Sequence, residues 1–136
     1  MPKTEVNDPK VVFMIDLDGT VWEDIPNEEA AERTLSAKIF PDAVEWINER
    51  YDRGHYICFF TARWESLREV TEQKLADIKV KYHELIMGKP RIRHTPYAGY
   101  HYIDNCSIIR ANRFEGAWTP MIKKKIVAHI FNEPQK

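Results

Sequence analysis

The first predicted strand of this chain ends in an acidic motif, and that junction constrains the fold more than any other feature. Residues 11–15 are five apolar residues in succession, the pattern of a strand buried on both faces of a parallel sheet covered by helices. Asp16, Asp18 and a Gly-Thr turn follow directly. Sites in α/β proteins form at the carboxyl ends of parallel strands, so the acidic pair indicates chemistry rather than packing.

Length and composition favour one soluble domain. The chain has 136 residues, of which 43% are apolar and 30% charged, enough for one hydrophobic core. We expect residues 1–9 to be a loose lead-in and residues 10–136 to form a single catalytic domain with a short flap around residues 21–40. The formal net charge of −1 argues against a dedicated nucleic-acid-binding protein.

Targeting signals and cysteines favour a cytoplasmic protein without a membrane partner. The first residues contain no apolar signal region, and no apolar run approaches the roughly 20 residues that span a bilayer. The two cysteines, Cys58 and Cys106, belong to no metal-binding pattern, and Cys58 is expected to be a core thiol.

Apolar runs and helical periodicities alternate along the rest of the chain. Further strands are predicted at residues 56–60, 82–87 and 100–103, and helices at about 41–53, 64–79 and from Pro120 onward. This alternation predicts a three-layer, doubly wound, mostly parallel Rossmann-like sheet. Each predicted strand leads into a polar residue, and a parallel sheet brings these to one edge: Asp16, Thr61, Lys89 and Asp104.

In order and spacing, these residues resemble the four motifs of the haloacid dehalogenase (HAD) superfamily. Residues 16–20 are similar to motif I, Thr61 to motif II, Lys89 to motif III and Asp104 to motif IV. The resemblance covers roughly residues 10–110 and implies an HAD-like fold. The intervals in which relatives carry a cap domain have no room for one here, so the chain resembles the capless phosphatases, including those associated with capsular polysaccharide synthesis.

The resemblance implies a Mg²⁺-dependent hydrolase of phosphomonoesters. Asp16 would be the nucleophile that forms an aspartyl phosphate, and Asp18 the general acid and then the general base. Thr61 would donate a hydrogen bond to a phosphoryl oxygen, and Lys89 would offset the negative charge of the site. Asp16, the backbone carbonyl of Asp18 and Asp104 would hold Mg²⁺.

Residues beside these motifs are further candidates for binding. Arg63 could contact substrate or form a salt bridge. Asn105 stands where motif IV often has a second acidic residue, and its carbonyl can still coordinate or orient a metal-bound water. Arg91, Arg93 and His94 form a basic cluster directly after Lys89, suited to a second anionic group such as a carboxylate, or else a solvated loop.

Each residue also has a purely structural interpretation. The aspartates and Thr61 could cap turns or a helix, Lys89 could be a surface lysine, and Trp22, at the start of the flap, could contact a leaving group or lie in the core. We expect an open site that takes a small phosphorylated substrate, with a phosphorylated sugar favoured. The resemblance also implies that this chain could form a homo-oligomer, because small capless relatives are oligomers in which a neighbouring subunit covers the site.

Two other functions compete with this one. A phosphatase for nucleic-acid ends would use the same chemistry on a 3′-phosphate and would need a basic groove beside the site. A catalytically silent scaffold would be expected to lack Asp16 or Lys89, and both are present.

Overall fold

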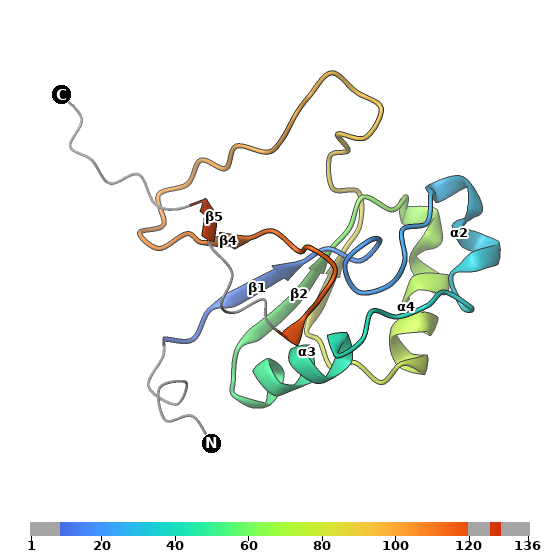
Figure 1. Ribbon diagram of the computed structural model, residues 1–136, viewed down its shortest axis with the longest axis horizontal. Coiled ribbons are helices and arrows are strands. Elements are labelled where there is room, and N and C mark those ends of the chain that lie inside the picture. The colour runs from blue at the N-terminus through green and yellow to red at the C-terminus, as the bar shows by residue number, and fades with distance from the viewer. Residues whose placement is uncertain (1–8, 120–125, 129–136) are drawn as a thin grey trace.

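The computed structural model describes residues 9–119 and the backbone of residues 126–128 (Figure 1). Within this part of the chain, no helix is long and apolar enough to cross a membrane. The elements follow the chain in the order β1 (Val12–Ile15), α2 (Asn27–Arg33), α3 (Ala43–Asp52), β2 (Tyr56–Phe60), a 3₁₀ turn η1 (Glu65–Leu67), α4 (Arg68–Asp77), β3 (Glu84–Ile86), β4 (Ala111–Asn112) and β5 (Ile126–Ala128).

A small parallel sheet with β2 at its centre organises the domain. β1 pairs with β2 from Val12↔Tyr56 to Ile15↔Phe59, and β2 pairs with β3 up to Phe60↔Ile86. Parallel neighbours need crossover connections, which here contain α3 and α4. The protein is therefore mixed α/β, as the alternation of patterns predicted, and the first three strands are confirmed.

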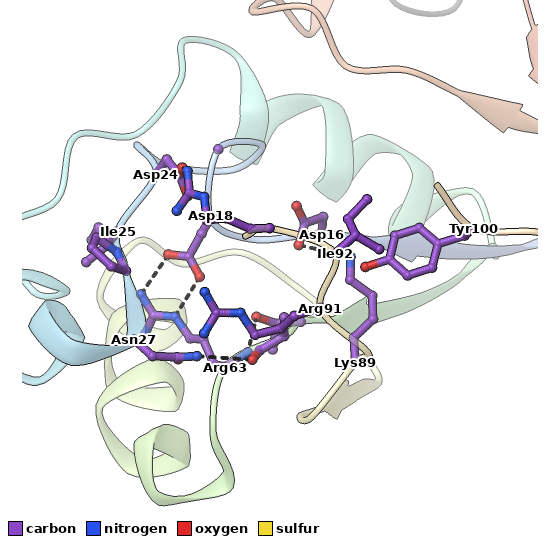
Figure 2. A pocket seen from close by; sticks show the side chains of 15 residues that line it. Asp16, Asp18, Asp24, Ile25, Asn27, Arg63, Lys89, Arg91, Ile92 and Tyr100 are labelled. Carbon is purple, nitrogen blue, oxygen red and sulfur yellow. Dashed lines mark hydrogen bonds and ion pairs between the residues drawn. The ribbon is translucent and has the colours of Figure 1, made fainter. Parts of the chain in front are cut away.

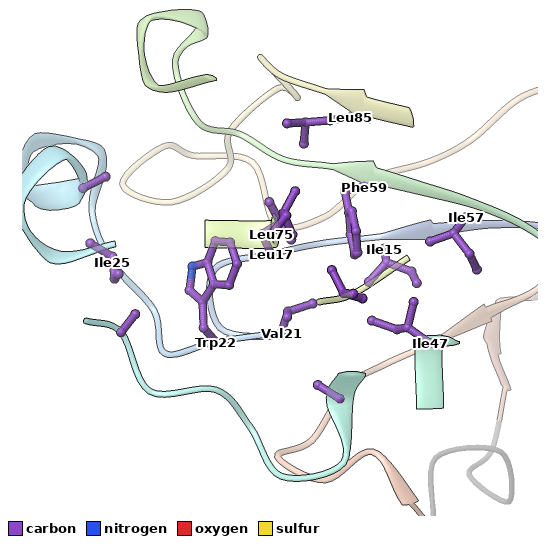
Figure 3. Close-up of a cluster of buried hydrophobic side chains, with 14 of the residues drawn as sticks. Ile15, Leu17, Val21, Trp22, Ile25, Ile47, Ile57, Phe59, Leu75 and Leu85 are labelled. Carbon is purple, nitrogen blue, oxygen red and sulfur yellow. The ribbon is translucent and has the colours of Figure 1, made fainter. Parts of the chain in front are cut away.

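The hydrophobic core lies between one face of the sheet and these two crossover helices (Figure 3). Ile57 and Phe59 point into it from β2 and are fully buried, as are Ile47 from α3 and Leu75 from α4. Residues two apart on a strand share a face, which explains why the five-residue apolar run of β2 contributes alternate side chains to this cluster. Cys58, on the other face, is also buried, as expected.

The second helical layer of a doubly wound sheet is not found in the described residues. Val12 and Met14, on the other face of β1, are 57% and 53% exposed. The helix predicted from Pro120 onward falls mostly outside the described residues. Its described part, Ile126–Ala128, is strand β5, antiparallel to β4, so the helix prediction is wrong there.

The strand predicted at residues 100–103 is not formed either. The chain from Met87 to Arg110 contains no helix or strand and runs away from the sheet before β4 (Figure 1, yellow to orange). Tyr102 and Ile103 are 68% and 85% exposed. A short stretch of strand-favouring residues becomes a strand only when a neighbouring strand pairs with its backbone, and the described residues supply no such neighbour.

The flap at residues 21–40 is more structured than a loop, because it contains helix α2. Its base is fixed by backbone hydrogen bonds from the Val21 nitrogen to the Leu17 oxygen (2.8 Å) and from the Phe40 nitrogen to the Val21 oxygen (2.9 Å). Lys74 of α4 donates to the carbonyls of Leu35 and Ala37. These contacts hold the flap against the domain that carries the strand ends.

Candidate active site

Three of the four predicted motif residues meet at the carboxyl edge of the sheet. Asp16 follows β1 and Thr61 follows β2, and the parallel register places them on neighbouring strands. The backbone nitrogen of Lys89 donates to the Thr61 carbonyl at 2.8 Å, which fixes the segment after β3 beside β2. The Lys89 ammonium then lies 3.3 Å from Asp16 Oδ1. Residues 16, 61 and 89 therefore form one cluster.

Asp16 lies in a partly dry environment beside a single cation. Burial raises the pKa of its carboxyl above the ordinary value, although the Lys89 ammonium and the Leu17 backbone lower it. Thr20 Oγ1 donates to Asp16 Oδ2 at 3.4 Å. Thr61 is buried, and its hydroxyl oxygen accepts a hydrogen bond from the Arg63 nitrogen, leaving the hydroxyl proton to be donated elsewhere.

Asp18 is held by a buried arginine. Arg63 Nε donates to Asp18 Oδ2 and Arg63 Nη2 to Asp18 Oδ1, both at 2.9 Å (Figure 2). The Arg63 side chain is 1% exposed and that of Asp18 15%. Trp22 Nε1 also donates to Asp18 Oδ1, at 3.0 Å, and Arg63 Nη1 donates to Thr71 Oγ1 at 2.8 Å. These donors fill three of the roughly four acceptor sites of the Asp18 carboxylate, and Oδ2 keeps one free.

This clamp concerns two residues whose interpretation the sequence left open. Arg63, a candidate for substrate contact, spends three of its five donors on Asp18 and Thr71. Trp22 is fully buried in the core and at the same time bonds Asp18. Both residues therefore position Asp18 in this structure.

An open pocket of about 250 Å³ lies over the strand ends (Figure 2). This volume is close to the lower end of the roughly 300–1,000 Å³ that small-molecule sites occupy. Polar and charged groups dominate its wall, and Tyr100 and Ile92 add apolar surface. The charged residues of the wall are three carboxylates and four cations: Asp16, Asp18, Asp24, Arg63, Lys89, Arg91 and Arg93.

Asp104 and Asn105 are not brought to this pocket. Both are exposed and lie in the segment that runs away from the sheet. Asp104 accepts hydrogen bonds from the Tyr102 hydroxyl at 2.6 Å and the Cys106 nitrogen at 2.9 Å, contacts that lower the pKa of its carboxyl. It caps a local turn, which is the structural interpretation that competed with metal binding. The predicted convergence of four strand ends is therefore wrong for the fourth in this structure.

The pocket offers oxygen donors of the kind that Mg²⁺ prefers, but only a few of them. Within residues 9–119, no three His, Cys, Asp or Glu side chains form a group that could hold a metal. Asp16 and the Asp18 carbonyl supply hard oxygen donors, and Mg²⁺ often binds through one or two carboxylates, with water and substrate phosphate as its other ligands. The residues present are compatible with an ion completed by water and substrate.

Some residues of the site have no recognisable motif in the sequence. Asn27, the first residue of α2, bonds the Ala62 carbonyl and the Trp64 nitrogen and so fastens the flap to the loop after β2. Asp24 forms an ion pair with Arg93, and both residues line the pocket. These pairs join positions 35 or more apart in sequence, and no local pattern predicts them. Comparisons with protein-family models, curated proteins and solved structures found no match to this chain.

Proposed function

We propose that this protein is a Mg²⁺-dependent phosphatase of the capless HAD type that hydrolyses a small phosphorylated metabolite through an aspartyl phosphate. The observation that carries the proposal is the ion pair of Asp16 with Lys89, next to Thr61, at the carboxyl ends of three adjacent parallel strands. A carboxylate nucleophile, a hydroxyl donor and an ammonium are what phosphoryl transfer to a carboxylate requires.

Each residue has a defined task in the proposed reaction. Asp16 attacks phosphorus, and the Lys89 ammonium and the Thr61 hydroxyl stabilise the charge on the phosphoryl oxygens. Asp16 and the Asp18 carbonyl would hold Mg²⁺, which when bound would supply further positive charge at the phosphoryl group. Asp18 delivers a proton to the leaving oxygen and later activates the water that cleaves the acyl phosphate.

The clamp on Asp18 adds a requirement to this scheme. A carboxyl that delivers a proton needs a free acceptor site to carry it, and here Oδ1 accepts from both Arg63 and Trp22, whereas Oδ2 accepts from Arg63 alone. In the proposed reaction Oδ2 is therefore the oxygen of Asp18 that takes up and delivers the proton. Arg63 holds the carboxyl ready in the absence of substrate.

The decisive experiment compares the wild type with Asp16→Asn on p-nitrophenyl phosphate and a panel of phosphorylated sugars, with Mg²⁺ and with EDTA. We expect Mg²⁺-dependent turnover that falls by at least about a thousandfold in Asp16→Asn, the scale of loss when a nucleophile is removed. Asp52→Asn, an exposed carboxylate paired with Lys81, is the matched control and should keep full activity. Equal rates from wild type and Asp16→Asn would overturn the proposal.

A phosphatase for nucleic-acid ends is the second candidate, because Arg91 and Arg93 line the same open pocket. A 3′-phosphorylated oligonucleotide belongs in the panel for this reason. Turnover of the oligonucleotide at a much higher kcat/KM than any phosphorylated sugar would favour that function over the first.

A further inference from the structure

The charged residues of the pocket leave one cation without a carboxylate. Asp16 pairs with Lys89, Asp18 with Arg63 and Asp24 with Arg93. Each of the three carboxylates thus has one cationic partner. Arg91 is the fourth cation of the wall, and no carboxylate of the described chain lies within 4.0 Å of it.

Arg91 is part of the pocket wall and is not a fully solvated surface residue. Arg91 is half-buried and lines the pocket, and its side chain lies beside those of Asp18 and Arg63 in the view of Figure 2. The neighbouring Pro90 carbonyl accepts a hydrogen bond from the Tyr100 hydroxyl, which ties this loop down beside the pocket. A guanidinium held in a recess without a carboxylate partner favours binding of an anion.

The phosphoryl group alone does not use this cation in the proposed reaction. The phosphoryl group is placed at Asp16, where Lys89 supplies the nearest positive charge. The wall carries a net charge of +1 before any metal binds, because four cations face three carboxylates. A bound Mg²⁺ would balance the roughly two negative charges of the phosphoryl group, so the charge of the wall would remain when the rest of the substrate is uncharged. A second acidic group on the substrate would compensate that remaining charge in a partly dry pocket.

We infer that Arg91 binds a second anionic group, a carboxylate or a phosphate, on the same small phosphomonoester that Asp16 attacks. The inference rests on the proposed function and narrows its substrate class to phosphorylated acids and bisphosphates. Arg91 is the residue that distinguishes them from phosphorylated sugars with no second acidic group. Its planar guanidinium forms two parallel hydrogen bonds with either kind of anion.

The test uses substrate pairs that differ in the second anion. Gluconate 6-phosphate is compared with glucose 6-phosphate for a carboxylate, and fructose 1,6-bisphosphate with fructose 6-phosphate for a phosphate. For the wild type, Arg91→Gln and Arg91→Lys, kcat/KM is measured on all four with Mg²⁺. Arg110→Gln removes an exposed arginine that does not line the pocket and is the matched control.

In at least one pair, we expect the wild type to prefer the substrate with the second acidic group by about tenfold or more in kcat/KM. This is the scale of one charge-assisted hydrogen bond. Arg91→Gln should abolish this ratio, Arg91→Lys should retain part of it, and Arg110→Gln should leave it unchanged. Whether the carboxylate or the phosphate pair shows the ratio identifies the second anion.

Three results would overturn the inference. Equal kcat/KM within both pairs for the wild type would show that no second anion is bound. If Arg91→Gln lowered kcat/KM equally on substrates with and without the second acidic group, Arg91 would be placed at the transferred phosphate instead. An oligonucleotide 3′-phosphate that exceeds every small substrate, with its preference lost in Arg91→Gln, would assign the cation to nucleic acid. If all four substrates are hydrolysed with no preference for the second acidic group, only the inference is refuted. If none of the substrates is hydrolysed, the proposed function is refuted as well.

Discussion

The buried pair of Arg63 and Asp18 allows the sharpest test of the site's construction. Arg63→Met keeps most of the side-chain volume but removes the guanidinium that donates two hydrogen bonds to Asp18. Asp18 then keeps only the bond from Trp22, with 15% of its side chain exposed. We expect the free energy of unfolding to fall sharply, because a carboxylate stays buried without its cation.

Two estimates of the loss agree. Removing one partner of a buried ion pair costs about 3–5 kcal/mol, because the remaining charge is uncompensated. Coulomb's law gives about 4 kcal/mol for unit charges roughly 4 Å apart at an effective dielectric constant of about 20. Domains of this kind are stable by about 5–15 kcal/mol, so the variant should lose a large share of its stability.

A double-mutant cycle in urea separates this pair from a general packing effect. Arg63→Met and Asp18→Asn should each be destabilising, and the double variant should lose about 2–3 kcal/mol less than the sum, because neither charge is then left alone. The exposed pair Lys81–Asp52, at 2.8 Å, is the control, and its cycle should give a coupling below about 1 kcal/mol. A coupling at Arg63–Asp18 no larger than that of the control would refute the reasoning.

Two further predictions concern stability. Lys74→Met removes the ammonium that donates to the carbonyls of Leu35 and Ala37, so the urea midpoint should shift by an amount equivalent to about 1–3 kcal/mol, whereas Lys38→Met, at an exposed position, should change it little. In EDTA at pH 7, Asp16→Asn should be more stable than the wild type, because burial raises the pKa of Asp16 in the folded state and so penalises its charged form. This gain should shrink as the pH falls and vanish below the unfolded value of about 3.9, where Asp16 is neutral in both states; a gain that persists at low pH would contradict the assigned cause.

Much of the site could be predicted from local patterns. Asp16, Thr61 and Lys89 each follow an apolar run, and the strands themselves form close to the predicted residues. Parallel pairing then forces their carboxyl ends to the same edge, so three residues that lie 45 and 28 positions apart converge without any knowledge of side-chain packing. The helix after Pro41 also forms, although it begins at Ala43, two residues later than proline placement suggested.

The prediction of a fourth strand at residues 100–103 was wrong, because four strand-favouring residues are weak evidence on their own. Residues 100–103 are mostly aromatic and apolar, but a strand forms only when an adjacent strand offers backbone partners, and that is a property of the assembled sheet. Asp104 follows the geometry of its own segment and caps a turn. The expected metal site therefore lacks its third carboxylate in the described residues.

The chain's local chemistry determined which residues end the strands, because apolar runs and turn residues act over a few positions. Only the tertiary structure decided what those residues touch. Asp18 could have faced substrate or protein, and the fold placed Arg63 against it from 45 residues away. Arg91 could have lain in solvent, and the loop after β3 placed it in the pocket without a carboxylate partner. Such pairings depend on how whole elements pack, and no short stretch of sequence contains that information.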